Sequence, residues 1–272
     1  MKAPSFAYAR PRALSEALEL LERHGDAARV LAGGQSLIPS LNMRLSAPEL
    51  LVDIGGLEEL ARIEVGEGAL RVGALVTHAR LERSPEVARL VPLLARAVPY
   101  VAHAAIRNRG TLGGSLALAD PAAEYPACVL ALEAVLLVAG RKGTRRVKAE
   151  DFFKGLFETD LRPGELLTGV EFPVAAKGER CAFEELARRQ GDYAIAGLAA
   201  RRAATLRLVF FGVGATPVLA RHAATQKTLR EASEALARDL DPAADLYHSA
   251  ATKLHLARVL LERAWNAIST SH

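Results

Sequence analysis

Cysteine is scarce in this sequence, and its scarcity restricts the cofactors that the chain can hold. The 272 residues include only Cys128 and Cys181, and each lies in an apolar context that predicts a buried thiol. A [2Fe–2S] cluster held by cysteines requires four of them. The chain therefore cannot hold such a cluster by itself, and an electron-transfer role would place the iron–sulfur centres on another polypeptide.

Long apolar runs and blocks of basic charge are also missing. No run of 18 apolar residues occurs, so we expect no membrane-spanning helix. Arg10, Arg12 and Glu16 interrupt the first 20 residues, so we expect no signal peptide and a cytoplasmic protein. The net charge is only +4 and the arginines are scattered, which argues against binding to nucleic acid.

The sequence lacks the patterns of a self-contained catalytic site. Its seven histidines show no metal-ligand spacing, and neither a Ser-His-Asp order nor a pair of catalytic carboxylates stands out. We therefore predict no catalytic and no metal-ligating residues. Chemistry would depend on a bound cofactor, which the protein positions and surrounds with its charges.

Half of the residues are apolar, which suits one large domain or two modest ones. The first 173 residues mix short helices and strands. We predict helices at 15–24 (with Ser15 as N-cap), 36–43, 77–82 and 87–104, the last kinked by Pro92 and Pro99, and strands at 29–32, 50–54 and 168–172. Residues 61–65 and 69–73 form a predicted hairpin, and residues 127–138 are either a helical turn plus a strand or one helix.

The pattern changes after Pro173. Three expected strands at 181–187, 193–200 and 206–213 are followed by two expected helices at 225–238 and 243–268. Strands followed by helices indicate an α+β domain. The sequence thus predicts an α+β protein of two domains with a boundary near residue 173.

Two glycine pairs dominate the chain. One lies in Ala32-Gly33-Gly34-Gln35-Ser36-Leu37 and the other in Gly110-Thr111-Leu112-Gly113-Gly114-Ser115. Glycine permits left-handed backbone and close approach of a ligand, and successive free N–H groups form a concavity for an anion. Two such loops could hold the two phosphates of a dinucleotide, although a single glycine pair is usually only a turn.

The flanking residues favour the ligand. The run from Ile106 to Ser115, together with Ala32 to Leu37, resembles the A-G-G-x-S-L and T-[IL]-G-G-[NSD] loops of the FAD-binding medium subunits of molybdenum hydroxylases. Carbon monoxide dehydrogenase and the xanthine dehydrogenases belong to this group. A third run, Arg189-Gln190-Gly191-Asp192-Tyr193-Ala194, is similar to its R-x-G-D-[YFW]-A motif. The three motifs occur in the family's order, so the resemblance covers almost the whole chain.

The resemblance implies a fold and a cofactor. It implies a two-lobed FAD-binding domain of the vanillyl-alcohol oxidase type over residues 1–173, with lobes at roughly 1–55 and 56–173. A C-terminal domain with a three-stranded sheet and helices would occupy residues 174–272. The implied FAD-binding residues are Ala32, Gly33, Gly34, Gln35, Ser36, Leu37, Ile106, Gly110, Thr111, Gly113, Gly114, Ser115, Glu124, Leu167 and Tyr193.

Within this set, the N–H groups of Gly33, Gly34, Gly113, Gly114 and Ser115 would bind the diphosphate, with help from the side chains of Gln35, Ser36 and Thr111.

Three other residues have alternative interpretations. Glu124 would accept a hydrogen bond from a sugar hydroxyl of FAD, or it is simply an acid at a helix N-terminus. Tyr193 would lie near the isoalloxazine ring, and Leu167 would pack on the flavin or adenine; otherwise each is a core residue. Many family members have a lysine within the segment that matches residues 183–186, where this chain has two glutamates.

The implied function is electron transfer in a molybdenum hydroxylase. Two [2Fe–2S] clusters on a small subunit and a molybdenum cofactor on a large subunit would deliver electrons to FAD in this chain, with the whole assembled as a dimer of heterotrimers. The alternatives are a stand-alone flavin oxidase or dehydrogenase of the same fold and a nucleotide-binding module without redox chemistry. The substrate and the terminal acceptor cannot be predicted from this chain.

Overall fold

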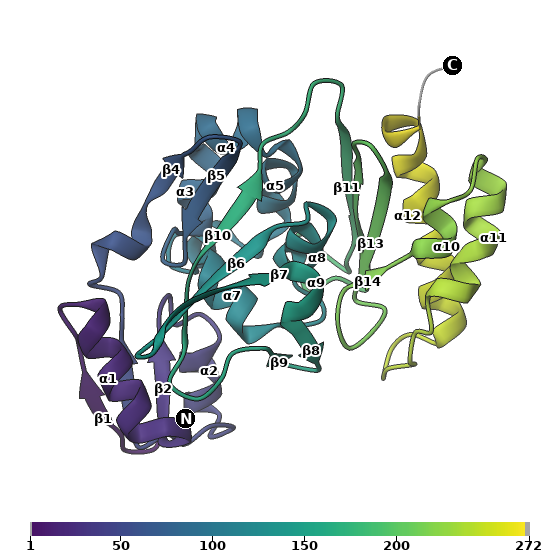
Figure 1. Cartoon of the computed structure of the whole chain (residues 1–272). Coiled ribbons are helices and arrows are strands. Elements are labelled where there is room, and N and C mark those ends of the chain that lie inside the picture. Colours follow the sequence, from purple (N-terminus) through teal and green to yellow (C-terminus); the bar gives the residue numbers. More distant parts are fainter. Residues whose placement is uncertain (1, 270–272) are drawn as a thin grey trace.

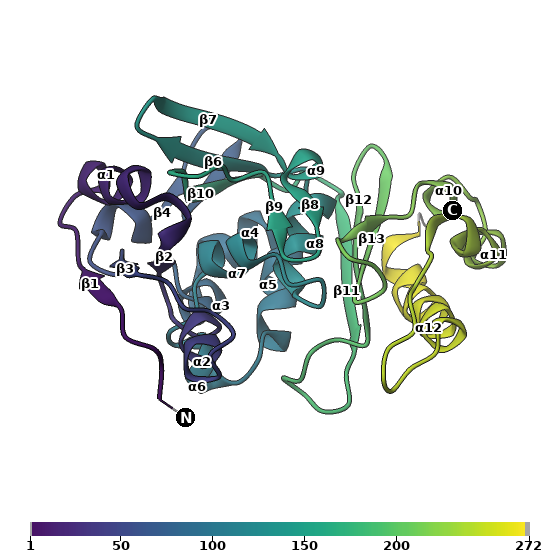
Figure 2. The same cartoon turned by 90° about the horizontal axis from the view of Figure 1, so that it is seen from below.

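Three sheets of three or more strands follow one another along the chain and also from one end of the molecule to the other (Figures 1 and 2). The structure is a computed structural model, and it describes residues 2–269. The first two sheets belong to the first 173 residues, and the third separates them from the C-terminal helices (Figure 1). This arrangement confirms the predicted α+β class with a small C-terminal domain.

The N-terminal lobe is a small parallel sheet with a helix on it. Strand order is β1-β3-β2, and both pairings are parallel. The predicted first helix is confirmed, but it begins one residue before Ser15, with Ala13 at its N-cap. The elements are β1 (Ala7–Ala9), α1 (Leu14–His24), η1 (Gly25–Ala27), β2 (Ala28–Leu31), α2 (Leu37–Asn42), β3 (Leu50–Asp53) and η2 (Glu58–Ala61).

The middle lobe contains a five-stranded antiparallel sheet in the order β4-β5-β10-β6-β7. The predicted hairpin is confirmed, because β4 pairs with β5 in antiparallel register. A separate two-stranded sheet pairs β8 with β9. The strands are β4 (Ile63–Val65), β5 (Ala69–Gly73), β6 (Val135–Gly140), β7 (Gly143–Lys148), β8 (Phe153–Gly155), β9 (Glu158–Thr159) and β10 (Leu166–Pro173).

Prolines divide the helical part of this lobe more sharply than predicted. Instead of one kinked helix over 87–104, α4 ends at Leu90 and α5 starts with Pro92, because proline lacks an N–H and suits the first position of a new helix. The helices are α3 (His78–Arg83), α4 (Pro85–Leu90), α5 (Pro92–Ala97), η3 (Val98–Tyr100), α6 (Ala104–Arg107), α7 (Leu112–Leu118), α8 (Glu124–Ala131) and α9 (Ala149–Phe152). Residues 127–138 are thus the end of α8 followed by a strand.

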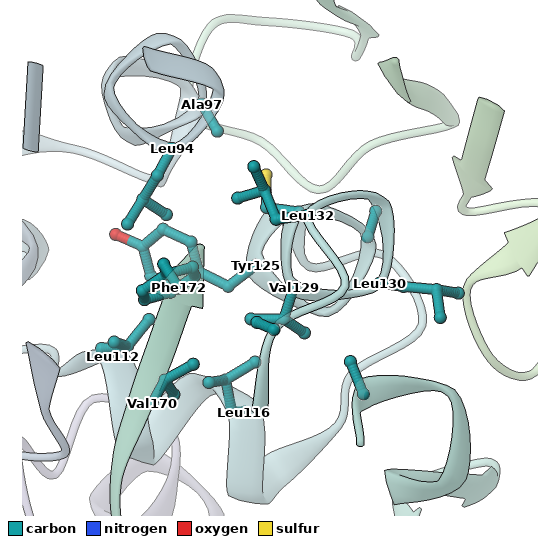
Figure 3. Close-up of a cluster of buried hydrophobic side chains, with 14 of the residues drawn as sticks. Leu94, Ala97, Leu112, Leu116, Tyr125, Val129, Leu130, Leu132, Val170 and Phe172 are labelled. Carbon is teal, nitrogen blue, oxygen red and sulfur yellow. The ribbon is translucent and has the colours of Figure 1, made fainter. Parts of the chain in front are cut away.

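Helix α8 is buried along its whole length and forms the centre of the main core. Tyr125 and Val129 point into a cluster with Leu112 and Leu116 of α7 and Phe172 of β10 (Figure 3). This packing fixes α7, which carries the second glycine loop at its N-terminal end.

The C-terminal domain is an antiparallel sheet, β11-β12-β13-β14, covered on one face by helices. The three predicted strands are confirmed, and the sheet has a fourth strand, β14, which is two residues long. The two predicted helices of this domain begin later in the chain than expected, because Thr228 and Ser249 are their N-caps. The elements are β11 (Arg180–Leu186), β12 (Ala196–Arg202), β13 (Leu206–Phe211), β14 (Val218–Leu219), α10 (Arg221–Ala224), α11 (Leu229–Asp239) and α12 (Ala250–Ile268). Residues 270–272 of the predicted domain lie outside the described residues.

Arginines of this sheet tie it to the middle lobe. The guanidinium of Arg201 bonds Glu133, which follows α8, at 2.9 Å and Glu179, which precedes β11, at 3.0 Å. Arg207 pairs with Glu150 of α9 at 2.5 Å. Arg201 and Glu179 are almost fully buried, so each charge depends on the other for compensation.

Candidate functional site

The two glycine motifs lie against each other in the structure, although about 75 residues separate them. A Cβ atom on Gly33 would be 2.3 Å from the carbonyl oxygen of Arg109 and 2.8 Å from Cα of Gly110. A Cβ on Gly114 would face that of Ala32 at 3.9 Å. Glycine at position 33 is therefore required for the close approach of the two loops.

The first loop presents a set of free N–H donors. It follows β2 at the carboxyl edge of the parallel sheet, and Gly34 takes a left-handed conformation with φ of 73°. Among the hydrogen bonds of residues 2–269, none uses the N–H groups of residues 33–37. Successive donors with left-handed backbone form an anion-binding concavity, so this loop suits a phosphate.

The second loop differs from the prediction, because its N–H groups are already occupied. Gly113 donates to the carbonyl of Ala74 at 2.9 Å, Gly114 to Oγ1 of Thr111 at 3.1 Å, and Ser115 to the carbonyl of Thr111 at 3.1 Å. The cause is that α7 begins here, with Thr111 as its N-cap. What remains for a ligand from this loop are the hydroxyl groups of Thr111 and Ser115.

A buried histidine and tyrosine support the second loop from beneath. The backbone N–H of His78 donates to the carbonyl of Gly110 at 3.0 Å, and a Cβ on Gly110 would lie 2.5 Å from Nε2 of the His78 ring. Tyr125 bonds Nδ1 of His78 at 3.0 Å. Burial, with a smaller effect of Arg107, lowers the pKa of His78 to about 4. The sequence analysis missed this pair, because 47 residues separate its members and neither belongs to a motif.

We predict that His78 makes the protein sensitive to acid. Its pKa in the folded state lies below the ordinary value of 6.5, so its contribution to stability is complete above pH 6.5 and is lost as the pH falls toward 4. The upper limit of that loss is about 3 kcal/mol. Urea unfolding at pH 7 and pH 5 should show about 2 kcal/mol of this loss. His78→Gln should flatten the pH dependence, whereas His24→Gln at an exposed position should leave it unchanged.

A hollow of about 470 Å³ opens beside the first loop. Its charged lining residues are Asp53, which ends β3, and Arg109, which precedes the second loop. Asp53 accepts hydrogen bonds from the hydroxyl of Tyr8 and from the N–H of Gly55. Its place at the carboxyl edge of a parallel sheet is a signal that sequence analysis could have used. The remaining lining residues are Leu31, Ala32, Gly33, Gly34, Gln35, Ile38 and Pro39.

The side chains of the first loop differ in their availability. The Nε2 group of Gln35 donates to the carbonyl of Gly33 at 3.0 Å, so this amide braces the loop itself. Ser36 is exposed at the N-cap of α2 and makes no side-chain cap bond. Leu37 is half-buried as the first residue of that helix.

The other predicted site residues occupy different surroundings. Ile106 accepts the N–H of Gly110 at 2.7 Å and so shapes the entry to the second loop. Leu167 is buried in β10 and belongs to the main core. Glu124 is 8% exposed at the first position of α8. Tyr193 is 73% exposed, which rules out the alternative that it is a core residue.

The third motif lies beside α6, which precedes the second loop. Gly191 has φ of 84°, and a Cβ there would be 2.6 Å from Nδ1 of His103. Partial desolvation of the phenol raises the pKa of Tyr193, and the negative charges of Asp120 and Glu124 add to the effect.

These features fit an anionic dinucleotide better than a metal or a lipid bilayer. Neutral N–H donors, hydroxyl groups and one arginine converge where the loops meet, which is the donor set that a diphosphate requires. Within residues 2–269, no three His, Cys, Asp or Glu side chains gather as a metal site. In the same part of the chain, no helix has both the length and the apolar character needed to span a bilayer.

Family models and relatives match this chain over most of its length. Residues 4–175 match the model of the FAD binding domain in molybdopterin dehydrogenase, and residues 181–268 match the CO dehydrogenase flavoprotein C-terminal domain. Subunit alpha of the 6-hydroxypseudooxynicotine dehydrogenase complex of Paenarthrobacter nicotinovorans is 37% identical over 97% of this chain and 94% of that protein.

Solved structures extend the comparison to the whole fold. A chain of carbon monoxide dehydrogenase from Hydrogenophaga pseudoflava superimposes with a TM-score of 0.93 at 35% identity, and one of quinoline 2-oxidoreductase from Pseudomonas putida 86 with 0.91 at 40%. Each comparison covers 98% of both chains. The resemblance inferred from three short motifs is thereby confirmed: the chain belongs to the family of FAD-binding medium subunits of molybdenum hydroxylases.

Proposed function

We propose that this chain is the FAD-binding electron-transfer subunit of a molybdenum hydroxylase complex. It would receive electrons from [2Fe–2S] clusters on a small subunit and pass them to a terminal acceptor. The observation that carries the proposal is the set of free N–H groups at residues 33–37 directly opposite the second glycine loop. FAD, when bound, supplies the capacity to take up and release electrons singly or in pairs.

Different residues of the chain would bind different parts of the cofactor. The N–H groups of residues 33–37 would bind diphosphate oxygens, and the hydroxyl groups of Thr111 and Ser115 would donate from the opposite side. Arg109 lines the same hollow and adds a positive charge. Asp53 accepts two hydrogen bonds from its own lobe and so stabilises the strand end from which the first loop departs.

At the other end of α7, further predicted residues would contact the flavin half. Glu124 is buried and makes no ion pair within the described residues, so its oxygens can accept from a sugar hydroxyl. The exposed ring of Tyr193 can cover one side of the isoalloxazine ring and limit access to it. Leu167, buried in the main core, would support these residues from beneath.

We also propose the domain division that the sequence indicated. A boundary after residue 173 is supported by β10 ending at Pro173 and β11 starting at Arg180. Lobes at roughly 1–55 and 56–173 are supported by β3 ending at Asp53 and β4 starting at Ile63. Both cysteines are free and buried, which is in keeping with a reducing compartment and with our proposal of the cytoplasm.

FAD specificity tests the proposal directly. We expect the purified chain to bind FAD noncovalently and at least about tenfold more tightly than FMN, because FMN lacks the second phosphate that two facing loops can hold. Acid precipitation followed by chromatography of the supernatant identifies the flavin. Flavin that stays with the pellet, or FMN alone in the supernatant, would contradict the assignment.

Partner dependence tests the electron-transfer role. We propose an iron–sulfur small subunit and a molybdenum-binding large subunit as partners, assembled as a dimer of heterotrimers. The names of the relatives above refer to different compounds, which is in keeping with substrate choice in another chain. The isolated chain should be reducible by dithionite yet show no dye reduction with candidate substrates, whereas co-expression with its genomic neighbours should restore turnover. Turnover by the chain alone would favour a stand-alone flavin oxidase or dehydrogenase.

A further inference from the structure

The second glycine loop lies along the segment 74–78, which begins directly after β5 and ends at the first residue of α3. Thr77 and Thr111 form an antiparallel bridge between the two. Three backbone hydrogen bonds of 2.9–3.0 Å join the same two segments, with donors in both. The position of residues 110–113 therefore depends on where the segment 74–78 places its backbone and its side chains.

Gly110 is packed tightly both against the ring of His78 and against the first loop. A Cβ atom on Gly110 would lie 2.5 Å from Nε2 and 2.8 Å from Cδ2 of His78, so the imidazole lies directly against the second loop. A Cβ on Gly33 of the first loop would lie 2.8 Å from Cα of the same Gly110. Because protein interiors are close-packed, a shift of the ring toward Gly110 would move the second loop relative to the first.

Tyr125 fixes the orientation of that ring. Its hydroxyl group is 3.0 Å from Nδ1 of His78, and the centroids of the two rings are 5.2 Å apart. Both side chains are buried, and Tyr125 points into the main core (Figure 3). Since Tyr125 is the second residue of α8, its hydrogen bond connects the second glycine loop to the helix that begins with Glu124.

We propose that His78 and Tyr125 are positioning residues that fix the second glycine loop relative to the first and thereby set the affinity of the chain for the diphosphate of FAD. The inference rests on the proposed function. Hydrogen bonds weaken outside donor–acceptor distances of about 2.7–3.2 Å, so donors on two loops bind one diphosphate only when the loops keep a fixed spacing. In this role His78 acts through the backbone of residues 110–113.

Removal of the Tyr125 hydroxyl is the most conservative test. Tyr125→Phe keeps the ring in the core and leaves Nδ1 of His78 without its partner, so we expect FAD binding to weaken about tenfold. Tyr100→Phe is the matched control, because the ring of this half-buried tyrosine packs against Phe183 of β11. Its FAD affinity should stay within about twofold of that of the unmodified chain. Titration of the FAD-free full chain with FAD, followed by quenching of flavin fluorescence, measures both.

A rescue experiment tests the contact between the ring and the loop. Gly110 does not have a positive φ, so alanine fits its backbone and collides only with its surroundings. Gly110→Ala and His78→Ala should each weaken FAD binding, the first by displacing the loop and the second by removing its support. In the double variant the new methyl group occupies part of the space that the ring leaves. We therefore expect it to bind FAD about threefold or more tightly than either single variant.

Urea unfolding of every variant separates stability from affinity. Leu236→Ala opens a cavity in the core under the C-terminal helices, and it should lower stability without changing FAD affinity. If the unmodified chain binds no FAD, the proposed function fails, and this inference fails with it. If it binds FAD but Tyr125→Phe keeps full affinity, or the double variant binds no better than Gly110→Ala, the positioning role is overturned while the proposed function stands.

Discussion

Replacing Gly114 by valine is expected to weaken FAD binding by about 100-fold or more, a loss of about 3 kcal/mol. The Cβ atom would lie 2.9 Å from Oγ1 of Thr111 and 3.9 Å from Cβ of Ala32. It would push aside the threonine that caps α7, and the two methyl groups would fill the space between the loops. Titration of the FAD-free chain with FAD, followed by quenching of flavin fluorescence, measures the change.

The fold should survive this substitution, because the only atom closer than 3.0 Å to the new Cβ is the end of a side chain. Gly66→Val provides a matched control, since its Cβ would make an ordinary contact of 3.6 Å with the carbonyl of Ala69 in the β4–β5 turn. Circular dichroism should report a folded chain in both variants. Unchanged FAD affinity in Gly114→Val would show that the space between the loops does not hold the cofactor.

Removing the guanidinium of Arg201 is expected to lower the free energy of unfolding by about 3–5 kcal/mol. Arg201→Met preserves much of the side-chain length but leaves Glu179 as a buried carboxylate without its partner, because only 2% of that side chain is exposed. It also cuts the link to Glu133 at the end of α8. Denaturant unfolding at pH 7 measures the effect.

The comparison variant is Arg230→Met, which removes an exposed ion pair with Glu234 within α11. Such pairs contribute little, so its stability should change by less than about 1 kcal/mol. If Arg201→Met unfolds like Arg230→Met, the ion pairs between the C-terminal sheet and the middle lobe contribute no more than surface charge does. Since α8 also carries Glu124, Arg201→Met should weaken FAD binding as well.

Several features were predictable from sequence because they depend on neighbouring residues. The hairpin at 61–73 follows from two short apolar runs around Gly66-Glu67-Gly68. The three long C-terminal strands follow from their composition. The left-handed turn at Gly34 and the close contact at Gly33 both require glycine. A glycine pair therefore predicts an unusual backbone conformation from the sequence alone, without knowledge of the tertiary fold.

Sequence patterns did not predict the structure correctly where the same local sequence is compatible with more than one conformation. Pro92 permits either a kink or a new helix, and only the packing of α5 against α8 and β11 decides for a new helix. Strand β1 is three residues long and largely exposed, so its sequence carries no pattern. It exists because β3 offers it a parallel edge.

By itself, the sequence determined the family, the class of cofactor and the two glycine loops, because spacing within a short motif fixes backbone geometry. Only the tertiary structure decided which groups in those loops are free. The N–H of Gly113 donates to the carbonyl of Ala74, His78 bonds Tyr125 beneath Gly110, and Oε2 of Glu185 is buried without a hydrogen-bond partner. The physical reason is that these hydrogen bonds join residues 39 and 47 positions apart in the chain, and no periodicity in the sequence indicates which distant residues will meet.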